Sequence, residues 1–519
     1  MLHERLPQSG VEVGPSKRWA PAFFLAAAFL IAASALFRAT NKDESQYVAA
    51  IALMRHGWPY LDFAYLQTPL QPLVLAPLAM LPAGFVYAGV RLANALFALG
   101  TLLVLFAGVR DRSGARSVLI MLVAALCTQP FLLAASLARN DALPMFLIAS
   151  AVATLLAAID SRSLRMFAAA GLFLGLATSA KISAALPASG AALFLLLRIR
   201  RFGVRSLAAF ALGAFVGLLP CFIFAAAAPS EFRFDVFSYS LDAPVQWWTS
   251  VGRGSDLEPL HRIVRLIGLS AQGCILVALA AVVFDRRRSD DRVLLDLMIL
   301  GGLAGAYMPE PAYPQYLVPL LPPLFARLPL ALDEAGRPWR RSLSSLAAIG
   351  SIAGLGFAAS HIRTDILVAE AARIGPKTAA LAGGGGIVSL SPEFVAGTGA
   401  DLDPRFAAGP FLFRTADGLA DQAERFGHAV SWQDVQRSLR KNPPAVILAG
   451  GEMRPHKPLH RHGLDAPLIG WALSQNYRPV SVSDGFIAYV RPKCPVRVRA
   501  SRRSAGFPYI PRRTTFPSP

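Results

Sequence analysis

Long apolar runs separated by short polar loops dominate the first 360 residues of the chain. A helix needs about 20 apolar residues to cross the hydrocarbon of a bilayer, and most of these runs approach that length. The runs are 19–37, 85–109, 117–134, 142–159, 166–180, 182–198, 206–228, 263–284, 293–308, 316–332 and 342–360. The pattern predicts a polytopic α-helical membrane protein with about 11 transmembrane helices. A further apolar stretch, 69–82, is rich in proline and is expected to be interfacial or re-entrant.

The pattern changes after residue 360. Within 361–490, short strand-like runs alternate with polar helical stretches, and the turn Ser483-Asp484-Gly485 between two apolar runs predicts a β-hairpin. Ser431 with Asp434 has the spacing of a capping box. We therefore expect four parts, which are a cytoplasmic segment 1–18, a transmembrane domain 19–360, an extracytoplasmic α/β domain 361–490 and a basic disordered tail 491–519.

Composition and charge agree with a membrane protein. Hydrophobic residues make up 54% of the chain and charged residues only 16%, whereas a soluble domain has about 25% charged residues. The net charge of +19 would suggest nucleic acid in a soluble protein. Here most arginines lie between the apolar runs, so we expect membrane lipids and no nucleic acid as partners.

The basic residues are concentrated in alternate loops, which predicts the orientation in the cytoplasmic membrane. The arginine-rich loops are expected in the cytoplasm, together with the N-terminus. The first loop, 38–84, and the C-terminal region should then lie on the outer face. The arginine-rich set comprises Arg110, Arg112 and Arg116; Arg162 and Arg165; Arg198, Arg200, Arg201 and Arg205; Arg286, Arg287, Arg288 and Arg292; and Arg337, Arg340 and Arg341.

The first outer loop contains two adjacent acids, Asp43 and Glu44. Residues 44–56 are expected to form a helix, with Asp43 as a cap and Gln46 three residues on. The alternative is chemical, because transfer of a sugar to a hydroxyl needs a carboxylate that accepts the proton. Ionisable residues at a membrane are often functional. The sequence leaves both roles of Asp43, helix cap and general base, open.

A second acid and several cations are predicted on the same membrane face. Asp141 follows Arg139 closely and could cap a helix or act beside a departing phosphate. Lys181 lies at the turn of a short apolar hairpin, where a lipid phosphate or snorkelling to headgroups would satisfy its charge. Arg91 near the end of the second run could pair with a carboxylate or contact the same phosphate.

These residues resemble the GT-C fold glycosyltransferases, particularly the protein O-mannosyltransferases and the aminoarabinose transferase of lipid A. The resemblance covers residues 20–330. It rests on Asp43-Glu44 with Tyr47, on Gly57 and Gln67-Thr68-Pro69-Leu70, on Val90-Arg91-Leu92, on Ala138-Arg139-Asn140-Asp141, on Gly175-Leu176-Ala177 through Lys181, and on the segment Tyr313 to Pro322.

The resemblance implies an inverting transfer from a polyprenyl-phosphate sugar donor on the outer face, to a lipid, glycan or protein acceptor. It implies Asp43 as the base, with Glu44 and Asp141 as further catalytic acids. Arg91, Arg139 and Lys181 are expected at the donor phosphate, and Tyr47, Tyr60 and Gln67 at the substrate. Gln46 and Thr68 stand where aminoarabinose transferases have Arg and Lys, so we expect a different sugar.

Other signals are weaker, and two rival functions stay open. Gly383–Gly386 is expected to be a flexible turn, and His456, His460 and His462 lack nearby acid or Cys ligands, so no metal site is predicted. No cofactor is expected, although a divalent cation is left open. Trp247 and Trp248 could stack on a sugar or belong to the interfacial aromatic belt, and the belt is the favoured assignment. The rivals are a lipid or sugar transporter, which would favour repeated halves, and a non-catalytic envelope-assembly subunit.

Overall fold

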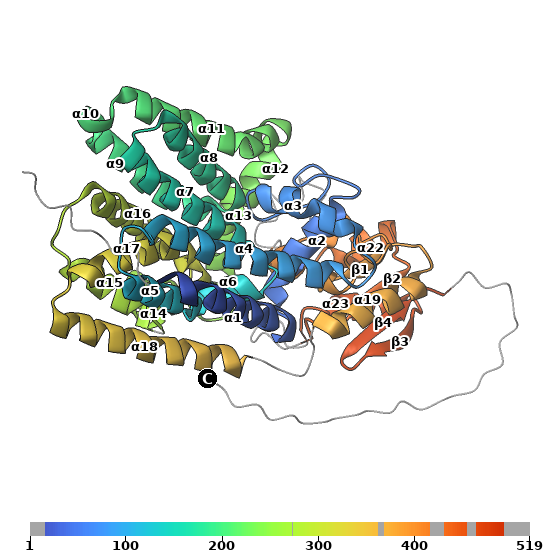
Figure 1. Cartoon of the computed structure of the whole chain (residues 1–519). Coiled ribbons are helices and arrows are strands. Elements are labelled where there is room, and N and C mark those ends of the chain that lie inside the picture. Colours follow the sequence, from blue (N-terminus) through green and yellow to red (C-terminus); the bar gives the residue numbers. More distant parts are fainter. Residues whose placement is uncertain (1–15, 272, 362–367, 416–429, 454–462, 493–519) are drawn as a thin grey trace, which may run out of the picture.

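The computed structural model describes residues 16–271, 273–361, 368–415, 430–453 and 463–492. A large helical bundle occupies most of the molecule, and a small sheet with its own helices lies at one end of it (Figure 1). The expectations for residues 1–15, for the tail 493–519 and for His456, His460 and His462 fall outside the described residues.

The bundle is built from helices that follow the apolar runs. Because apolar side chains surround most of these helices, the sequence can bury one face and leave the other toward lipid. The helices are α1 (Ser16–Phe37), α4 (Val86–Val109), α5 (Ala115–Leu126), α6 (Gln129–Ser136), α7 (Ala142–Ser161), α8 (Leu164–Ala180), α9 (Ala185–Leu197), α10 (Ile199–Phe202), α11 (Val204–Ala227), α14 (Pro259–Ala271), α15 (Ile275–Phe284), α16 (Asp290–Tyr307), α17 (Leu321–Glu334) and α18 (Arg337–Ser360).

Five helices in the described part of the chain are long and apolar enough to cross a membrane, namely α1, α4, α7, α11 and α18. The number rises to 7 if the bent pairs α5–α6 and α14–α15 each count as one span. The chain is therefore a multi-pass membrane protein, and the predicted count of about 11 spans stays a prediction. The proline-rich stretch forms the short helix α3 (Leu70–Leu75) followed by a 3-10 turn, Ala76–Met80.

Glycines bring α8 and α11 into direct backbone contact. A Cβ at Gly171 would lie 2.0 Å from the carbonyl oxygen of Phe210, and one at Gly213 would lie 1.9 Å from the carbonyl oxygen of Ala168. Small residues of this kind let helices approach closely in a bilayer, where packing rather than hydrophobicity drives association. The close pair fixes the end of α8, which is where Lys181 follows.

The arginine-rich loops meet at the end of the bundle away from the sheet. Arg112 forms ion pairs with Asp160 at the end of α7 and Asp291 at the start of α16, and Arg198 pairs with Asp290 at 3.1 Å. The loops that the sequence assigns to one membrane face are thus brought together. The sheet and the first outer loop lie at the opposite end (Figure 1).

The small sheet has four strands in the order β1-β2-β4-β3. The strands are β1 (Ile387–Ser389), β2 (Val446–Ala449), β3 (Arg478–Ser483) and β4 (Phe486–Val490), accompanied by α19 (Val368–Ala382), α20 (Pro410–Thr415), α22 (Val435–Lys441) and α23 (Ala466–Ser474). β1 and β2 are parallel, while β3 and β4 form the antiparallel hairpin that the sequence predicts. Asp434 donates its backbone N–H to Ser431 Oγ at 3.1 Å, as expected of a cap.

The two faces of the sheet contribute to different cores, because successive side chains of a strand point to opposite faces. Val446 and Leu448 of β2 join a core that includes Val48 and Ile51 of α2 (Ser45–Leu53) in the first outer loop. Ile447 packs on the other face in a core with α23. The C-terminal region therefore shares one core with the loop that contains Asp43, and its 3-10 turn Pro392–Phe394 contacts α2.

Candidate active site

The first outer loop starts its helix differently from the prediction. Asn41, rather than Asp43, is the N-cap of the 3-10 turn Lys42–Glu44, and its side chain accepts the backbone N–H of Asp43 at 2.9 Å. Glu44 closes the capping box by accepting the N–H of Asn41 at 2.8 Å. The prediction of Asp43 as a cap with Gln46 as its partner is wrong, because the turn begins two residues earlier. The Asp43 carboxylate is left for other contacts.

Glu44 is used for structure and does not reach the cavity described below. It is fully buried and accepts two bonds from the Arg91 guanidinium, at 2.8 and 2.6 Å, and one from the Tyr87 hydroxyl at 2.6 Å. The backbone N–H of Ala138 also donates to it, at 2.5 Å. Glu44 therefore joins the first loop to α4 and to the end of α6 and lies outside the lining of the cavity, where a catalytic acid was expected.

Arg91 takes the structural alternative that the sequence left open. Its guanidinium is fully buried and, besides Glu44, donates to the carbonyl oxygens of Ala35, Arg38 and Ala39 at 2.8 to 3.1 Å. Glu44 and these carbonyl oxygens occupy the N–H donors of the Arg91 guanidinium. A phosphate could bind Arg91 only by displacing these buried hydrogen bonds. Arg91 thus lies in a buried ion pair outside the lining of the cavity, and its expected contact with the donor phosphate stays a prediction.

A chain of alternating charges connects three loops at the outer end of the bundle. Arg139 pairs with Asp43 through Nη1 and with Asp141 through Nε, the second contact at 3.1 Å. Lys181, directly after α8, pairs with the other oxygen of Asp141. The order along this charge chain is thus Asp43, Arg139, Asp141 and Lys181. The side chain of Asp43 is 34% exposed, whereas the other three are almost buried.

Asp141 does not act as a helix cap. It precedes α7, but its side chain makes no capping hydrogen bond and instead binds Arg139 and Lys181. Burial alone would raise its pKa, yet Lys181 and Arg139 together hold that pKa below its ordinary value. Asp141 is consequently ionised at neutral pH, and its role is to hold the two cations in place.

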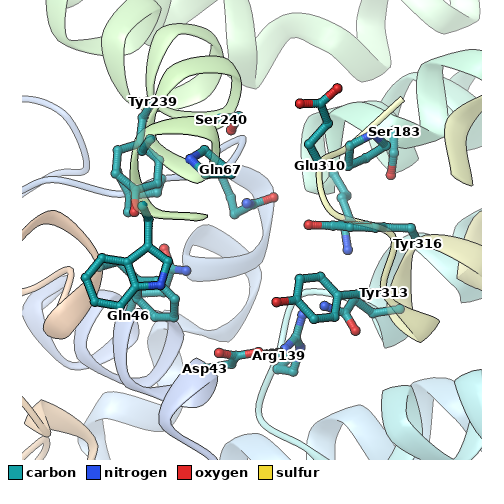
Figure 2. A pocket seen from close by; sticks show the side chains of 18 of the residues that line it. Asp43, Gln46, Gln67, Arg139, Ser183, Tyr239, Ser240, Glu310, Tyr313 and Tyr316 are labelled. Carbon is teal, nitrogen blue, oxygen red and sulfur yellow. Dashed lines mark hydrogen bonds and ion pairs between the residues drawn. The ribbon is translucent and has the colours of Figure 1, made fainter. Parts of the chain in front are cut away.

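A cavity of about 460 Å³ opens beside this charge chain. Asp43, Arg139, Lys181, Tyr47 and Gln67, five of the residues that the sequence singled out, line this cavity together. Figure 2 shows Asp43 and Arg139 close together, with Tyr313 and Tyr316 on one side of the cavity and Tyr239 and Gln46 on the other. Acid, cations and aromatic rings thus face one space.

Tyr60 is the predicted substrate residue that the structure places elsewhere. It is fully buried and its hydroxyl donates to the carbonyl oxygen of Gln67 at 2.5 Å. Tyr60 has a positive φ of 67° and packs against Phe224 and Phe232. Tyr60 therefore holds the loop that presents Gln67 and does not itself line the cavity, where a substrate contact was expected.

Several cavity residues were missed by the sequence analysis. Helix α13 (Tyr239–Ser250) contributes Tyr239, Trp247 and Trp248, although the two tryptophans were assigned to the aromatic belt. The loop before η6 (Pro314–Leu320) contributes Glu310 and Tyr313. The many aromatic residues in these two segments were the sequence feature that could have indicated a place in the cavity. Two polar atoms of the lining, Gln46 Oε1 and Ser183 Oγ, are buried without a hydrogen-bond partner, so a polar ligand could bond them.

The C-terminal region also reaches the cavity, which no sequence pattern indicated. Phe411, Arg414 and Thr415 of α20 lie in its wall. Within the described ranges, no group of three or more His, Cys, Asp or Glu side chains has a metal-binding arrangement.

Comparisons with known proteins agree with the geometry. Residues 65–309 match the family model of Glycosyltransferase family 87, and no curated protein sequence matches the chain. The fold is similar to ArnT from Cupriavidus metallidurans bound to undecaprenyl phosphate, with 16% identity, a TM-score of 0.57 and coverage of 91% of this chain and 98% of ArnT. Apo ArnT gives 15% identity and a TM-score of 0.56, covering 92% of this chain and 99% of that chain.

A second similar structure is the arabinofuranosyltransferase AftD from Mycobacteria, with 16% identity and a TM-score of 0.52. That similarity covers 92% of this chain and 40% of AftD. The fold expected from the sequence is confirmed, because the chain has the fold of these GT-C membrane glycosyltransferases, and residues 65–309 match a glycosyltransferase family model.

Proposed function

We propose that the chain transfers a sugar from a polyprenyl-phosphate donor to a hydroxyl group of an acceptor, with inversion, on the outer face of the cytoplasmic membrane, and that Asp43 is the base. One observation carries the proposal. The Asp43 carboxylate is released from capping by Asn41 and faces the cavity, next to cations held by Asp141.

Two observations support a polyprenyl-phosphate donor, namely the cations that line the cavity and the similarity of the fold to ArnT. Lys181 and Arg139 both line the cavity, and charge-assisted bonds from such groups bind phosphate oxygens strongly. The structure of ArnT, which shares the fold, contains undecaprenyl phosphate. In this proposal Lys181 contacts the donor phosphate and Arg139 lies between that phosphate and the base.

The reaction is a single displacement at the sugar carbon. The acceptor oxygen forms a bond to that carbon while the bond to the phosphate oxygen breaks, and the lipid phosphate leaves with the bonding electrons. Asp43 takes the hydroxyl proton as attack proceeds, and the cations stabilise the negative charge that develops on the phosphate. Asp141 stays ionised throughout, because its role is to orient Lys181 and Arg139.

The membrane face follows from the two ends of the bundle. The arginine-rich loops meet at one end, and loops of this kind are retained in the cytoplasm. The cavity belongs to the opposite end, next to the sheet. This arrangement supports an outer-face site with the N-terminus in the cytoplasm.

Purified protein should transfer labelled sugar from at least one of a series of polyprenyl-phosphate sugars, and Asp43→Asn should abolish most of that transfer. We expect transfer to persist in EDTA, since the two cations already supply positive charge at the phosphate. A transporter would instead move labelled lipid across a vesicle without cleaving it. Movement without cleavage, for every donor in the series, would contradict the proposal.

A further inference from the structure

A second cavity lies at the arginine-rich end of the bundle, far from the candidate active site. α9, α10 and the start of α16 border it, at the end of the bundle opposite to the sheet (Figure 1). Its volume is about 480 Å³, which is within the range of about 300–1,000 Å³ that is usual for ligand pockets. The proposed sugar transfer uses none of its residues. Four arginines and one acid line it, namely Arg198, Arg200, Arg201, Arg288 and Asp290.

Close backbone contact between α9 and α16 fixes the position of this arginine cavity. A Cβ at Gly190 of α9 would lie 2.4 Å from the carbonyl oxygen of Leu297. In the other direction, a Cβ at Gly301 of α16 would lie 2.2 Å from the carbonyl oxygen of Leu186. Larger residues at these positions would push the two helices apart. The end of α9 and the start of α16, which border the cavity, are therefore held side by side.

Asp290 orients two of the arginines. Its side chain is only 6% exposed and pairs with Nε of Arg198 at 3.1 Å and with Nη1 of Arg201 at 2.7 Å. A carboxylate has about four acceptor sites, whereas two guanidinium groups offer about ten N–H donors. The acid therefore holds both guanidinium groups in place and leaves most of their donors for a ligand.

The other two arginines of the cavity are weakly engaged. Arg200 has no ion pair within the described part of the chain. Arg288 contacts Asp296 at 3.4 Å, and that carboxylate also accepts a closer contact from Arg327 at 3.0 Å. Both arginines are exposed, so their side chains can turn toward an anion in the cavity.

Arg292, at the same end of the bundle, shows the contrast. Its guanidinium is engaged by two acids, Asp285 at 2.9 Å and Glu334 at 3.5 Å. In the arginine cavity, four arginines share the single acid of the lining, Asp290. An excess of cations at a concave surface attracts anions, and the planar fork of guanidinium donors matches the oxygens of a phosphate. The arginine cavity therefore has the properties of a phosphate-binding site.

We infer that the arginine cavity binds the phosphate of an anionic phospholipid from the membrane leaflet at this end of the bundle. Basic pockets between membrane helices on the cytoplasmic side bind anionic headgroups in this way. Leu197, the last residue of the apolar helix α9, also lines the cavity and is 63% exposed. It provides a contact for the apolar part of a lipid, which a free phosphate lacks. The inference is independent of the proposed sugar transfer, because binding requires no donor.

The test is native mass spectrometry of the full-length protein in a neutral detergent with added phospholipid. Phosphatidylglycerol, which is anionic, should bind saturably and more tightly than zwitterionic phosphatidylethanolamine. The double variant Arg200→Gln/Arg288→Gln removes the two arginines that do not hold Asp290. It should lower the affinity for phosphatidylglycerol by about 10–150-fold, as expected for loss of contacts to a charged group. Its melting temperature without lipid should stay close to that of the unmodified protein.

The matched control is Arg116→Gln/Arg165→Gln, which removes two exposed arginines of the same end that lie outside the cavity lining. It should bind phosphatidylglycerol normally. Equal weakening in both double variants would mean general attraction to a basic surface and would overturn the inference. Displacement of phosphatidylglycerol by inorganic phosphate would overturn it as well, because the site would then be one for a free anion. If the cavity double variant does not fold, Arg200→Gln alone, which loses no ion pair, should still weaken binding by about tenfold.

Discussion

The side chain of Asn41 accepts the backbone N–H of Asp43 at 2.9 Å, so the helix of the first outer loop starts without the Asp43 carboxylate. The carboxylate instead contacts Arg139 and faces the cavity. Asn41 therefore provides the cap, and the Asp43 carboxylate is available for the role of base that we propose.

Replacement of Asp43 should affect chemistry far more than folding. Asp43→Asn keeps the side-chain volume but cannot accept the proton of the acceptor hydroxyl, so turnover should fall by about 10²–10⁴-fold. Donor binding should persist. The measurement is initial rate together with donor affinity and melting temperature in the same detergent.

The matched variant is Asn41→Ala, which removes the cap that the structure shows. It should lower stability by about 0.5–2 kcal/mol. Near-normal turnover of Asp43→Asn would rule out this residue as the base. Unchanged stability of Asn41→Ala would contradict the assignment of the cap to Asn41.

Glu44 should behave as a structural residue. Glu44→Gln removes the charge that neutralises Arg91 in a fully buried pair, and breaking such a pair costs about 3–5 kcal/mol. Thermal denaturation should show a large decrease. Asp111→Asn, in the exposed pair with Arg110, should change the melting temperature little. Normal stability of Glu44→Gln with selective loss of turnover would return Glu44 to the catalytic candidates.

Lys181 should determine donor affinity. Lys181→Met removes one of the cations next to the cavity, and a contact to a charged group is worth about 1.5–3 kcal/mol, so affinity should fall by roughly 10–150-fold. Asp141 keeps Arg139 as a partner, which limits the loss of stability. Lys377→Met, whose ammonium only donates to the carbonyl oxygen of Val482, is the control. Donor binding by isothermal titration that is equal in both variants would contradict the assignment.

Asp235 should make stability depend on pH. It is buried, and burial raises its pKa to about 7, although the N–H of Tyr65 donates to it at 2.9 Å. Between about pH 4 and 7 the unfolded chain has lost this proton and the folded chain retains it, so stability falls as pH rises, by about 1.4 kcal/mol per pH unit from this group.

Asp235→Asn removes that titration while keeping an acceptor for Tyr65. Relative to the unmodified protein, the variant should become progressively more stable as pH increases from 4 to 7. Melting temperatures measured across this range are sufficient. A difference that stays constant with pH would show that Asp235 ionises normally in the folded protein.

The orientation gives a prediction about the C-terminal region. Because the C-terminal region shares a core with the first outer loop, both should lie outside the cytoplasm. A reporter fused after Pro519 that is active only in the cytoplasm should be silent, whereas one fused within the arginine-rich loop near Arg200 should be active. Activity of the first fusion would contradict the outer-face site.

The spacing of apolar runs and the distribution of charge were sufficient to predict that the chain is a polytopic membrane protein. Apolar runs can be recognised as membrane helices from the sequence alone, because each helix satisfies its own backbone hydrogen bonds within the bilayer. The β3–β4 hairpin was also predictable, since its turn and strands are local. Loops on one membrane face lie within a narrow layer. Four site residues could therefore be proposed from the sequence, namely Asp43, Arg139, Asp141 and Lys181.

Only the tertiary structure decided what each of these side chains does. Asp43 and Glu44 are adjacent in sequence, but one faces the cavity and the other is buried on Arg91. That difference depends on the start of the 3-10 turn at Lys42 and on the position of α4, which brings Arg91 to Glu44 from another part of the chain. Arg414 of α20 reaches the cavity because the C-terminal region shares a core with the first loop. Contacts between distant segments leave no periodic signal in the sequence, so they emerged only when the packed chain brought those segments together.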